Sequence, residues 1–298
     1  RLGLSATPER AGDPNGTQAI LTYFEGIVQP PFTLADAIAA GALTPYAYHI
    51  HRVCLTSDEQ ERWNAATHKI RRLFAQSLSA RRDDPVHERL QRELIRRARI
   101  VKKAEEKTTA AARVLRQNYR QGSRWIVYCD DQEQLTDVLN ELRTEFGSGV
   151  LEYHSAMTGD RERTLALFEQ AGGIVVSIRC LDEGVDIPAV DSALILASSK
   201  NPREYVQRRG RVLRKHRGKS VAQVHDVLVT PTIDPEEPTN TSIVGGEIVR
   251  AIEFGRSALN PSCVSDLERI AIEYGLDFDE LRDVGVEDDD DQSTESEA

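Results

Sequence analysis

Hydrophobic side chains in the middle of the chain gather in short runs that are rich in β-branched and aromatic residues. Runs of this length and composition, bounded by turn residues, are typical of strands buried on both faces. They predict five strands, at 125–129, 150–154, 174–178, 193–197 and 221–229.

Between these runs, apolar residues return at intervals of three and four, which indicates helices. Asp130-Asp131 and Thr158-Gly159-Asp160 are good helix starts, and a further helix is predicted at 202–209. Strands that alternate with helices predict an α/β fold, a mostly parallel sheet covered on both faces. In such sheets the chemistry lies in loops after the carboxyl ends of strands, which here begin at Cys129, His154, Arg179 and Ala197.

Two segments outside this alternation have a helical character of their own. Residues 58–121 are rich in arginine and nearly free of Gly and Pro, which predicts two or more helices. Residues 243–283 read as short helices. His49 and His51 would place both rings on one face of a strand, a pattern more typical of ordinary residues than of a metal site.

The net charge of −10 over 298 residues argues, as an average, against a nucleic-acid partner. The charge is divided, however. Residues 58–121 hold 17 Lys/Arg and 9 Asp/Glu, a net of +8, and residues 232–298 hold 4 and 19, a net of −15. The acidic run at 285–298 predicts a disordered tail. The mean charge therefore does not exclude nucleic acid.

The four cysteines form no C-x-x-C pair, which disfavours a structural zinc site, and we predict no metal ligands. Cys129 and Cys180 adjoin apolar runs and are expected to be buried. No apolar run is long enough to span a membrane. Together with the unpaired cysteines and the absence of a visible leader, this favours a cytoplasmic location without a membrane partner.

The most informative motif is Gln207-Arg208-Arg209-Gly210-Arg211-Val212-Leu213-Arg214. Arginines spaced by three would share one helical face, and guanidinium groups suit phosphate oxygens. A polyphosphate site and a solvated or RNA-facing basic patch are both open on this pattern.

A second motif, 180–188, places three carboxylates beside Gly184 in the loop after the third strand. No G-x-x-x-x-G-K-S/T phosphate loop exists; Lys219-Ser220 has the right ending, but Leu213 stands where the first Gly should be. This favours a structural or nucleic-acid-side role for Asp182-Glu183 over magnesium binding.

With Ser5-Ala6-Thr7 near the start, these motifs resemble in order and spacing those of superfamily 2 helicases and translocases. Residues 2–8 look like motif III, 125–129 like motif IV, 180–188 like motif V and 207–214 like motif VI. The resemblance implies a RecA-like α/β sheet with a helical insertion and short C-terminal helices. It also implies an ATP-dependent enzyme whose ATP and Mg²⁺ are bound mainly by an N-terminal RecA-like domain.

The resemblance assigns roles to individual residues. Arg211 and Arg214 would be arginine fingers and Gln207 would contact phosphates or the attacking water. Asp186 would approach the ribose, and Gly184, which has no side chain, would let the backbone come close to the nucleotide. Ser5 and Thr7 would couple hydrolysis to movement. The nucleic-acid path would be lined by Ser155, Arg179, Cys180, Leu181, Asp182 and Glu183.

The family's phosphate loop and DExx box belong upstream of Ser5, so we expect this piece alone to be inactive. The resemblance divides the chain into 1–10 (end of the first RecA-like domain), 11–122 (linker and basic helices), 123–231 (second RecA-like domain), 232–284 (C-terminal helices) and 285–298 (acidic tail).

The long segment before motif IV resembles that of restriction- and repair-type DNA helicases, which favours duplex DNA as the track. The basic segment, with Arg96, Arg97, Lys102 and Lys103, could grip phosphates or could be a solvated insertion. A non-catalytic interaction module and an RNA helicase are the alternatives. An attached nuclease or methylase stays open.

Overall fold

The computed structural model describes residues 2–3, 13–30, 32–81, 83–178, 190–197, 210–233 and 242–276. Its centre is a six-stranded sheet in the order β1-β6-β5-β2-β4-β3, in which every neighbouring pair is parallel. The strands are β1 Tyr46–Val53, β2 Arg124–Cys129, β3 Val150–Tyr153, β4 Gly173–Ile178, β5 Ser192–Ile195 and β6 Ala222–Val229. The predicted parallel α/β fold is confirmed.

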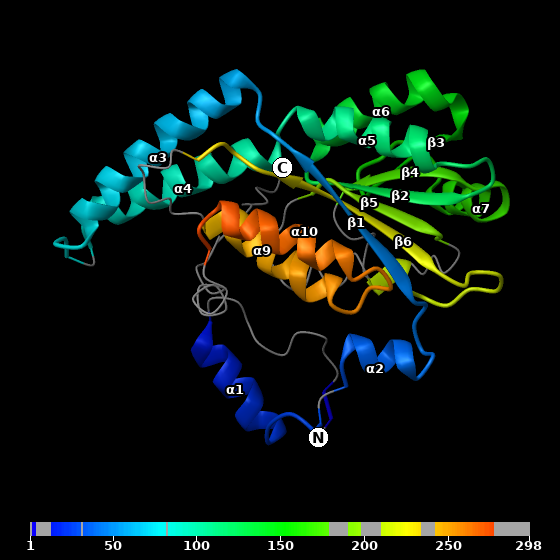
Figure 1. Ribbon diagram of the computed structural model, residues 1–298, viewed down its shortest axis with the longest axis horizontal. Coiled ribbons are helices and arrows are strands. Elements are labelled where there is room, and N and C mark those ends of the chain that lie inside the picture. Colours follow the sequence, from blue (N-terminus) through cyan, green and yellow to red (C-terminus); the bar gives the residue numbers. More distant parts are fainter. Residues whose placement is uncertain are drawn as a thin grey trace.

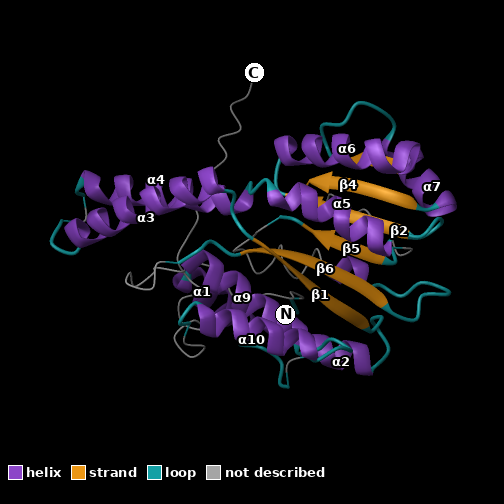
Figure 2. Ribbon diagram, turned by 45° about the horizontal axis from the view of Figure 1, so that its top comes forward, coloured by secondary structure: helices purple, strands orange, loops and turns teal. Residues whose placement is uncertain are grey.

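Helices cover both faces of this sheet (Figures 1 and 2). Helices α5 and α6 pack on one face, and α9 and α10 lie on the other against β6 and β1. The described helices are α1 Pro14–Phe24, α2 Leu34–Ala39, α3 Ser57–Ser77, α4 Pro85–Lys102, α5 Glu106–Asn118, α6 Gln132–Phe146, the single 3₁₀ turn η1 Gly147–Gly149, α7 Arg161–Ala171, α9 Ser242–Gly255 and α10 Ser262–Glu273.

The central strands form because their side chains are almost all apolar and can be buried on both faces. In β2, residues 125–129 are all buried, and Cys129 is buried as expected. All five predicted strands are confirmed to within two residues at each end. The side chain of Asp131 accepts a hydrogen bond from Gln134 N and that of Asp160 from Arg163 N, so both predicted helix starts are confirmed.

The sheet contains one strand that the hydrophobic pattern did not predict. Strand β1 comes from the segment 11–122, which the sequence assigned to a linker and basic helices, and pairs with β6 along its whole length. It was missed because it is an edge strand with alternating polar positions, where His49 and His51 interrupt the apolar run. These two histidines do share a face, as expected, and stack against His225 of β6.

The basic segment forms three helices. Helices α3 and α4 pair as a hairpin that projects away from the sheet, while α5 returns to it (Figures 1 and 2). We call α3 and α4 the helical hairpin. The predicted helices of 243–283 are α9 and α10, whereas the helix predicted at 202–209 lies outside the described residues.

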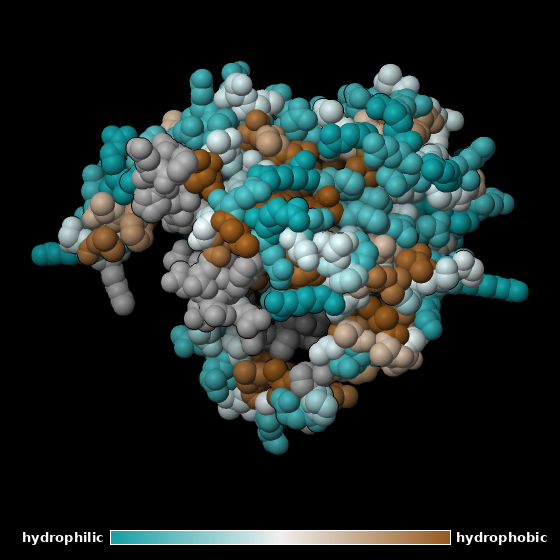
Figure 3. Space-filling model, viewed as in Figure 1, coloured by the Kyte–Doolittle hydropathy of each residue, from teal (hydrophilic) through white to brown (hydrophobic). Residues whose placement is uncertain are grey.

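The surface differs between the two ends of the face shown in Figure 3. It is largely hydrophilic over α10, whereas hydrophobic side chains gather near α1 at the lower end. Helix α1 buries none of its residues, and Tyr23, Ile27 and Val28 are exposed around its C-terminal end. Among the described helices, none is long and apolar enough to cross a membrane.

Candidate functional site

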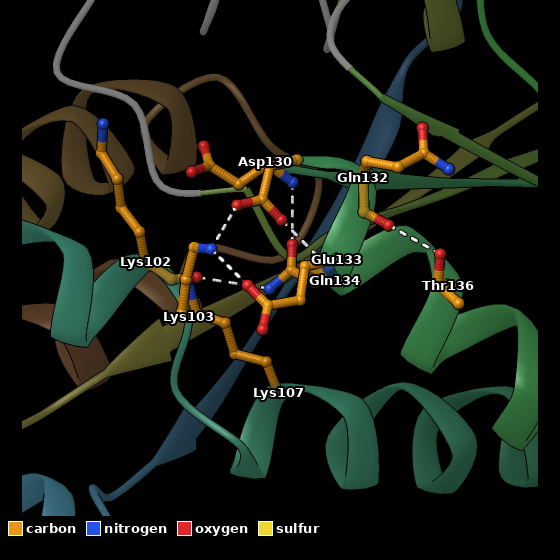
Figure 4. Close-up of polar contacts among 9 residues, drawn as sticks. Lys102, Lys103, Lys107, Asp130, Gln132, Glu133, Gln134 and Thr136 are labelled. Carbon is orange, nitrogen blue, oxygen red and sulfur yellow. Dashed lines mark hydrogen bonds and ion pairs between the residues drawn. The ribbon is translucent and has the colours of Figure 1, made fainter. Parts of the chain in front are cut away.

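The carboxyl end of β2 carries a compact set of polar contacts that joins the sheet to the helical hairpin (Figure 4). Lys103, just after α4, forms ion pairs with Asp131 (2.8 Å) and Glu133 (2.5 Å). Hydrogen bonds to both carboxylates raise the pKa of Lys103, so its positive charge is favoured. Gln134 reinforces the junction by donating to Lys102 O over 3.3 Å and accepting from Asp130 N over 2.8 Å.

Directly behind this junction lies a buried lysine. Lys107, on the first turn of α5, has no exposed surface and donates from Nζ to Lys102 O over 3.0 Å (Figure 4). Burial lowers its pKa, while the carboxylates of Glu247, Asp130 and Asp226 oppose that shift. Tyr48 in turn donates to Asp226 over 2.7 Å. Charged groups from α5, α9, β6 and the end of β2 therefore meet beneath this edge of the sheet.

Ser155 lies at the same edge, in the turn after β3, and its side chain is exposed. Its neighbour His154 is buried and its Nε2 lies 2.7 Å from Glu152 Oε1, which fixes the turn at the strand end. Ser155 is thus exposed beyond the end of a strand, and its predicted nucleic-acid contact stays a prediction.

The two arginines expected to reach ATP lie at the other edge of the sheet. Residues 210–212 end a helical turn, and Arg214 forms an isolated bridge with Leu43, just before β1 begins. Thr44 N donates to Leu213 O over 2.7 Å, and Thr44 Oγ1 donates to Arg214 O over 3.3 Å. Arg211 and Arg214 are both half-buried. The structure therefore places these two on one segment, at the opposite edge of the sheet from Ser155.

A residue outside the helicase motifs holds this arginine segment in place. Lys219 Nζ donates to Val212 O over 2.7 Å and to Val190 O over 2.8 Å. Burial lowers its pKa to about 8, opposed by Asp191. Both acceptors are backbone carbonyls, so the local sequence offered no signal beyond the near-match to a phosphate loop. Lys219 ties the end of the arginine segment to Val190, two residues before β5 begins.

The other sequence-predicted site residues lie outside the described part of the chain. The prediction that Cys180 is buried concerns a residue outside it as well. They are Ser5, Thr7, Arg179, Cys180, Leu181, Asp182, Glu183, Gly184, Asp186 and Gln207. Their assigned roles stay predictions. Among the described residues, no group of three or more His, Cys, Asp or Glu side chains could hold a metal ion.

Comparison with known proteins gives one family match. Residues 106–216 match the helicase conserved C-terminal domain. The DNA 3'-5' translocase XPB2 of Sulfurisphaera tokodaii is 25% identical over 233 residues, covering 72% of this chain and 50% of the relative. The chain thus spans about half the length of that relative. The resemblance to superfamily 2 helicases is confirmed, and the restriction-type branch stays a prediction.

Solved structures also align with the chain. The Hef helicase domain of Pyrococcus furiosus gives a TM-score of 0.49 at 14% identity, covering 77% of this chain and 64% of that one. The SWI2/SNF2 ATPase core of Sulfolobus solfataricus, in complex with dsDNA, gives 0.47 at 14% identity, covering 80% and 50%.

Proposed function

We propose that this chain, whose residues 106–216 match the helicase conserved C-terminal domain, is the C-terminal motor domain of an ATP-dependent translocase that moves on duplex DNA. The translocase name of the Sulfurisphaera tokodaii relative supports the choice of DNA. The observation that carries the proposal is the joint placement of Arg211 and Arg214 on a half-buried segment tethered through Thr44 and Lys219.

In this proposal Arg211 and Arg214 approach the γ-phosphate of ATP held by an N-terminal RecA-like domain. Phosphoryl transfer builds up negative charge on the transferring oxygens, and a fixed guanidinium offsets it without reorganising. Such a role needs a rigid backbone, which the contacts of Leu213 and Arg214 with Thr44 supply. Gln207, Gly184 and Asp186 would complete the nucleotide site, and Ser5 and Thr7 would couple it to movement.

The nucleic-acid side of the proposal uses the opposite edge of the sheet. Ser155 is exposed after β3, and in the sequence Arg179 to Glu183 follow directly after β4, the neighbour of β3. Because β3 and β4 are parallel, residues that follow them start from one edge. A DNA strand passing there would contact Ser155 and the 179–183 segment.

The test is Arg211→Ala in the full-length protein. DNA-stimulated ATP turnover is expected to fall by about 10³-fold, the scale of an arginine finger, while ATP binding is retained. Arg217→Ala is the matched control, because Arg217 is exposed and lies six residues along the same segment. Turnover near the wild-type level in Arg211→Ala would contradict the proposal.

The same assay separates the alternatives. A non-catalytic platform would bind DNA without any ATP turnover in the unmodified protein. An RNA helicase would be stimulated by RNA and not by duplex DNA.

A further inference from the structure

One face of α4 carries a row of arginines that the helicase motifs do not use. Arg89, Arg92, Arg96 and Arg99 are spaced by three, four and three residues, so they line one side of the helix over about 15 Å. The other side is the buried seam against α3, formed by Val86, Glu93, Arg97, Ala98 and Val101. We call the four arginines the α4 stripe.

We propose that the α4 stripe is a binding site for the sugar-phosphate backbone of duplex DNA. The inference rests on the proposed DNA translocase function and adds to it a contact surface outside the conserved motifs. It depends on which charges of the basic segment are available to a ligand, because a cation that is already paired or buried has little to offer a phosphate.

Several cations of the basic segment are engaged within the protein. Arg97 is 2% exposed, lies over the Trp63 ring at 5.0 Å, and burial lowers its pKa to about 10. Lys69 pairs with Glu93, and Lys103 pairs with Asp131 and Glu133. The sequence left open whether Arg96, Arg97, Lys102 and Lys103 grip phosphates or are solvated. Arg97 does neither, because its side chain is in the seam.

The stripe arginines are exposed and only weakly engaged. Arg89 and Arg92 use Nε on carbonyls of their own helix, both at 3.4 Å. Arg96 keeps one long contact of 3.9 Å with Glu93, and its side chain is 68% exposed. Within the part of the chain that the structure describes, the side chain of Arg99 makes no hydrogen bond or ion pair, and its backbone carbonyl accepts a hydrogen bond from Lys103 N. A phosphate would therefore gain these guanidinium donors without displacing strong internal contacts.

The stripe borders a groove of about 830 Å³ between the helical hairpin and the starts of α5 and α6. Arg92, Arg96 and Arg99 line it from α4, and Arg62 lines it from α3. Its inner end reaches Glu133 and Gln134, directly after the carboxyl end of β2. The groove thus leads from the stripe to the edge of the sheet where Ser155 lies.

Acidic residues also line this groove, and two of them are already neutralised or bonded. Glu133 pairs with Lys103, and Glu59 accepts hydrogen bonds from Thr56 N (2.9 Å) and Glu105 N (3.0 Å). Glu59 lies in the first turn of α3 and Glu133 in the first turn of α6. Along the stripe itself the charge is positive, which is the complement of a phosphate backbone.

The geometry favours a duplex over a single strand. Single strands are held by aromatic side chains on which bases stack, and the residues lining the groove include none. A straight row of cations about 15 Å long instead matches a stiff duplex, along which it spans roughly four base pairs.

The experiment measures the affinity of the full-length protein for a 20-base-pair duplex, without nucleotide, between about 50 and 200 mM salt. The variant replaces Arg89, Arg92, Arg96 and Arg99 by Gln. The control replaces Arg113, Arg116, Arg120 and Arg143 by Gln, which removes the same charge from exposed positions on α5, on α6 and in the turn before β2. Thermal melting of both variants checks that they fold.

The stripe variant is expected to bind duplex at least about ten-fold more weakly, with the slope of log K against log salt reduced by about 0.9 for each phosphate that an arginine no longer neutralises. The control keeps the wild-type slope. A slope in the stripe variant equal to that of the control would overturn the proposal, as would an equally large fall in affinity for a single strand of the same length. If the unmodified protein fails to bind duplex, the proposed function fails as well; if it binds and only the stripe is inert, the proposed function stands.

Discussion

The parallel sheet and the helical hairpin are stabilised in different ways although they adjoin in one chain. In the sheet, the strands bury apolar side chains such as Val127, Leu194 and Val224 completely. In the hairpin, Trp63, Ile70 and Val101 share the seam with Glu93 and Arg97. Apolar burial gives the sheet its stability, whereas the hairpin includes charged groups that must be paired or stacked. The hairpin is therefore suited to presenting charge, and the sheet to holding fixed geometry.

The largest expected difference between the two regions is in the free energy of unfolding that a buried apolar side chain contributes. Leu194→Ala removes a fully buried side chain from β5 and is expected to lower the free energy of unfolding by about 2–5 kcal/mol. Leu90→Ala, at a half-buried position on α4, should cost clearly less. Urea unfolding of the two variants measures both values, and equal losses would contradict the division between the regions.

The second prediction concerns the pH dependence of stability that His51 of β1 and His225 of β6 give the sheet. Burial lowers the pKa of His51 to about 4 and of His225 to about 3. In the unfolded chain both titrate near 6.5, so below that pH the unfolded state binds more protons and folded stability falls. The fall is up to about 1.4 kcal/mol per pH unit for each imidazole, down to the folded pKa. Above about pH 7 neither contributes a pH dependence.

Melting temperatures between pH 7.5 and 4.5 measure this fall. The double variant His51→Gln and His225→Gln should show a flatter profile than the unmodified protein. A profile as steep in the double variant as in the unmodified protein would show that other groups cause the pH dependence.

The third and smallest effect concerns the charged seam of the hairpin. Lys69→Met leaves the Glu93 carboxylate without its lysine partner and is expected to cost about 1–2 kcal/mol, because Lys69 is half exposed. Adding Glu93→Leu should restore most of that loss. Arg116→Met breaks an exposed pair with Glu145, which solvent screens, and should cost less than Lys69→Met. Chemical unfolding measures the free energy of unfolding of the three variants. If the double variant is no more stable than Lys69→Met, the unpaired Glu93 carboxylate is not the cause of the loss.

The sequence predicted the sheet well because continuous apolar runs have few alternatives. The run at 125–129 and its neighbours could be placed from composition alone, and Asp131 and Asp160 marked the helix starts. Strand β1 could not be placed in this way, since an edge strand with alternating histidines looks like a surface segment. Arg96 and Arg97 are equivalent in composition, and only the packing of α4 on α3 decides that one is exposed and the other buried.

The sequence by itself determined the fold class, the order of the central elements and the helicase resemblance, because these depend on local periodicity and on motif spacing. The tertiary structure alone decided that Lys219 tethers the arginine segment, that Lys103 joins the hairpin to the sheet, and that Arg214 and Ser155 lie at opposite edges. Those facts depend on contacts between residues far apart in the chain, for which neighbouring residues carry no signal. The acidic average of −10 likewise says nothing about where the positive charge is presented. The packing of α4 on α3 leaves four arginines exposed along one side of α4.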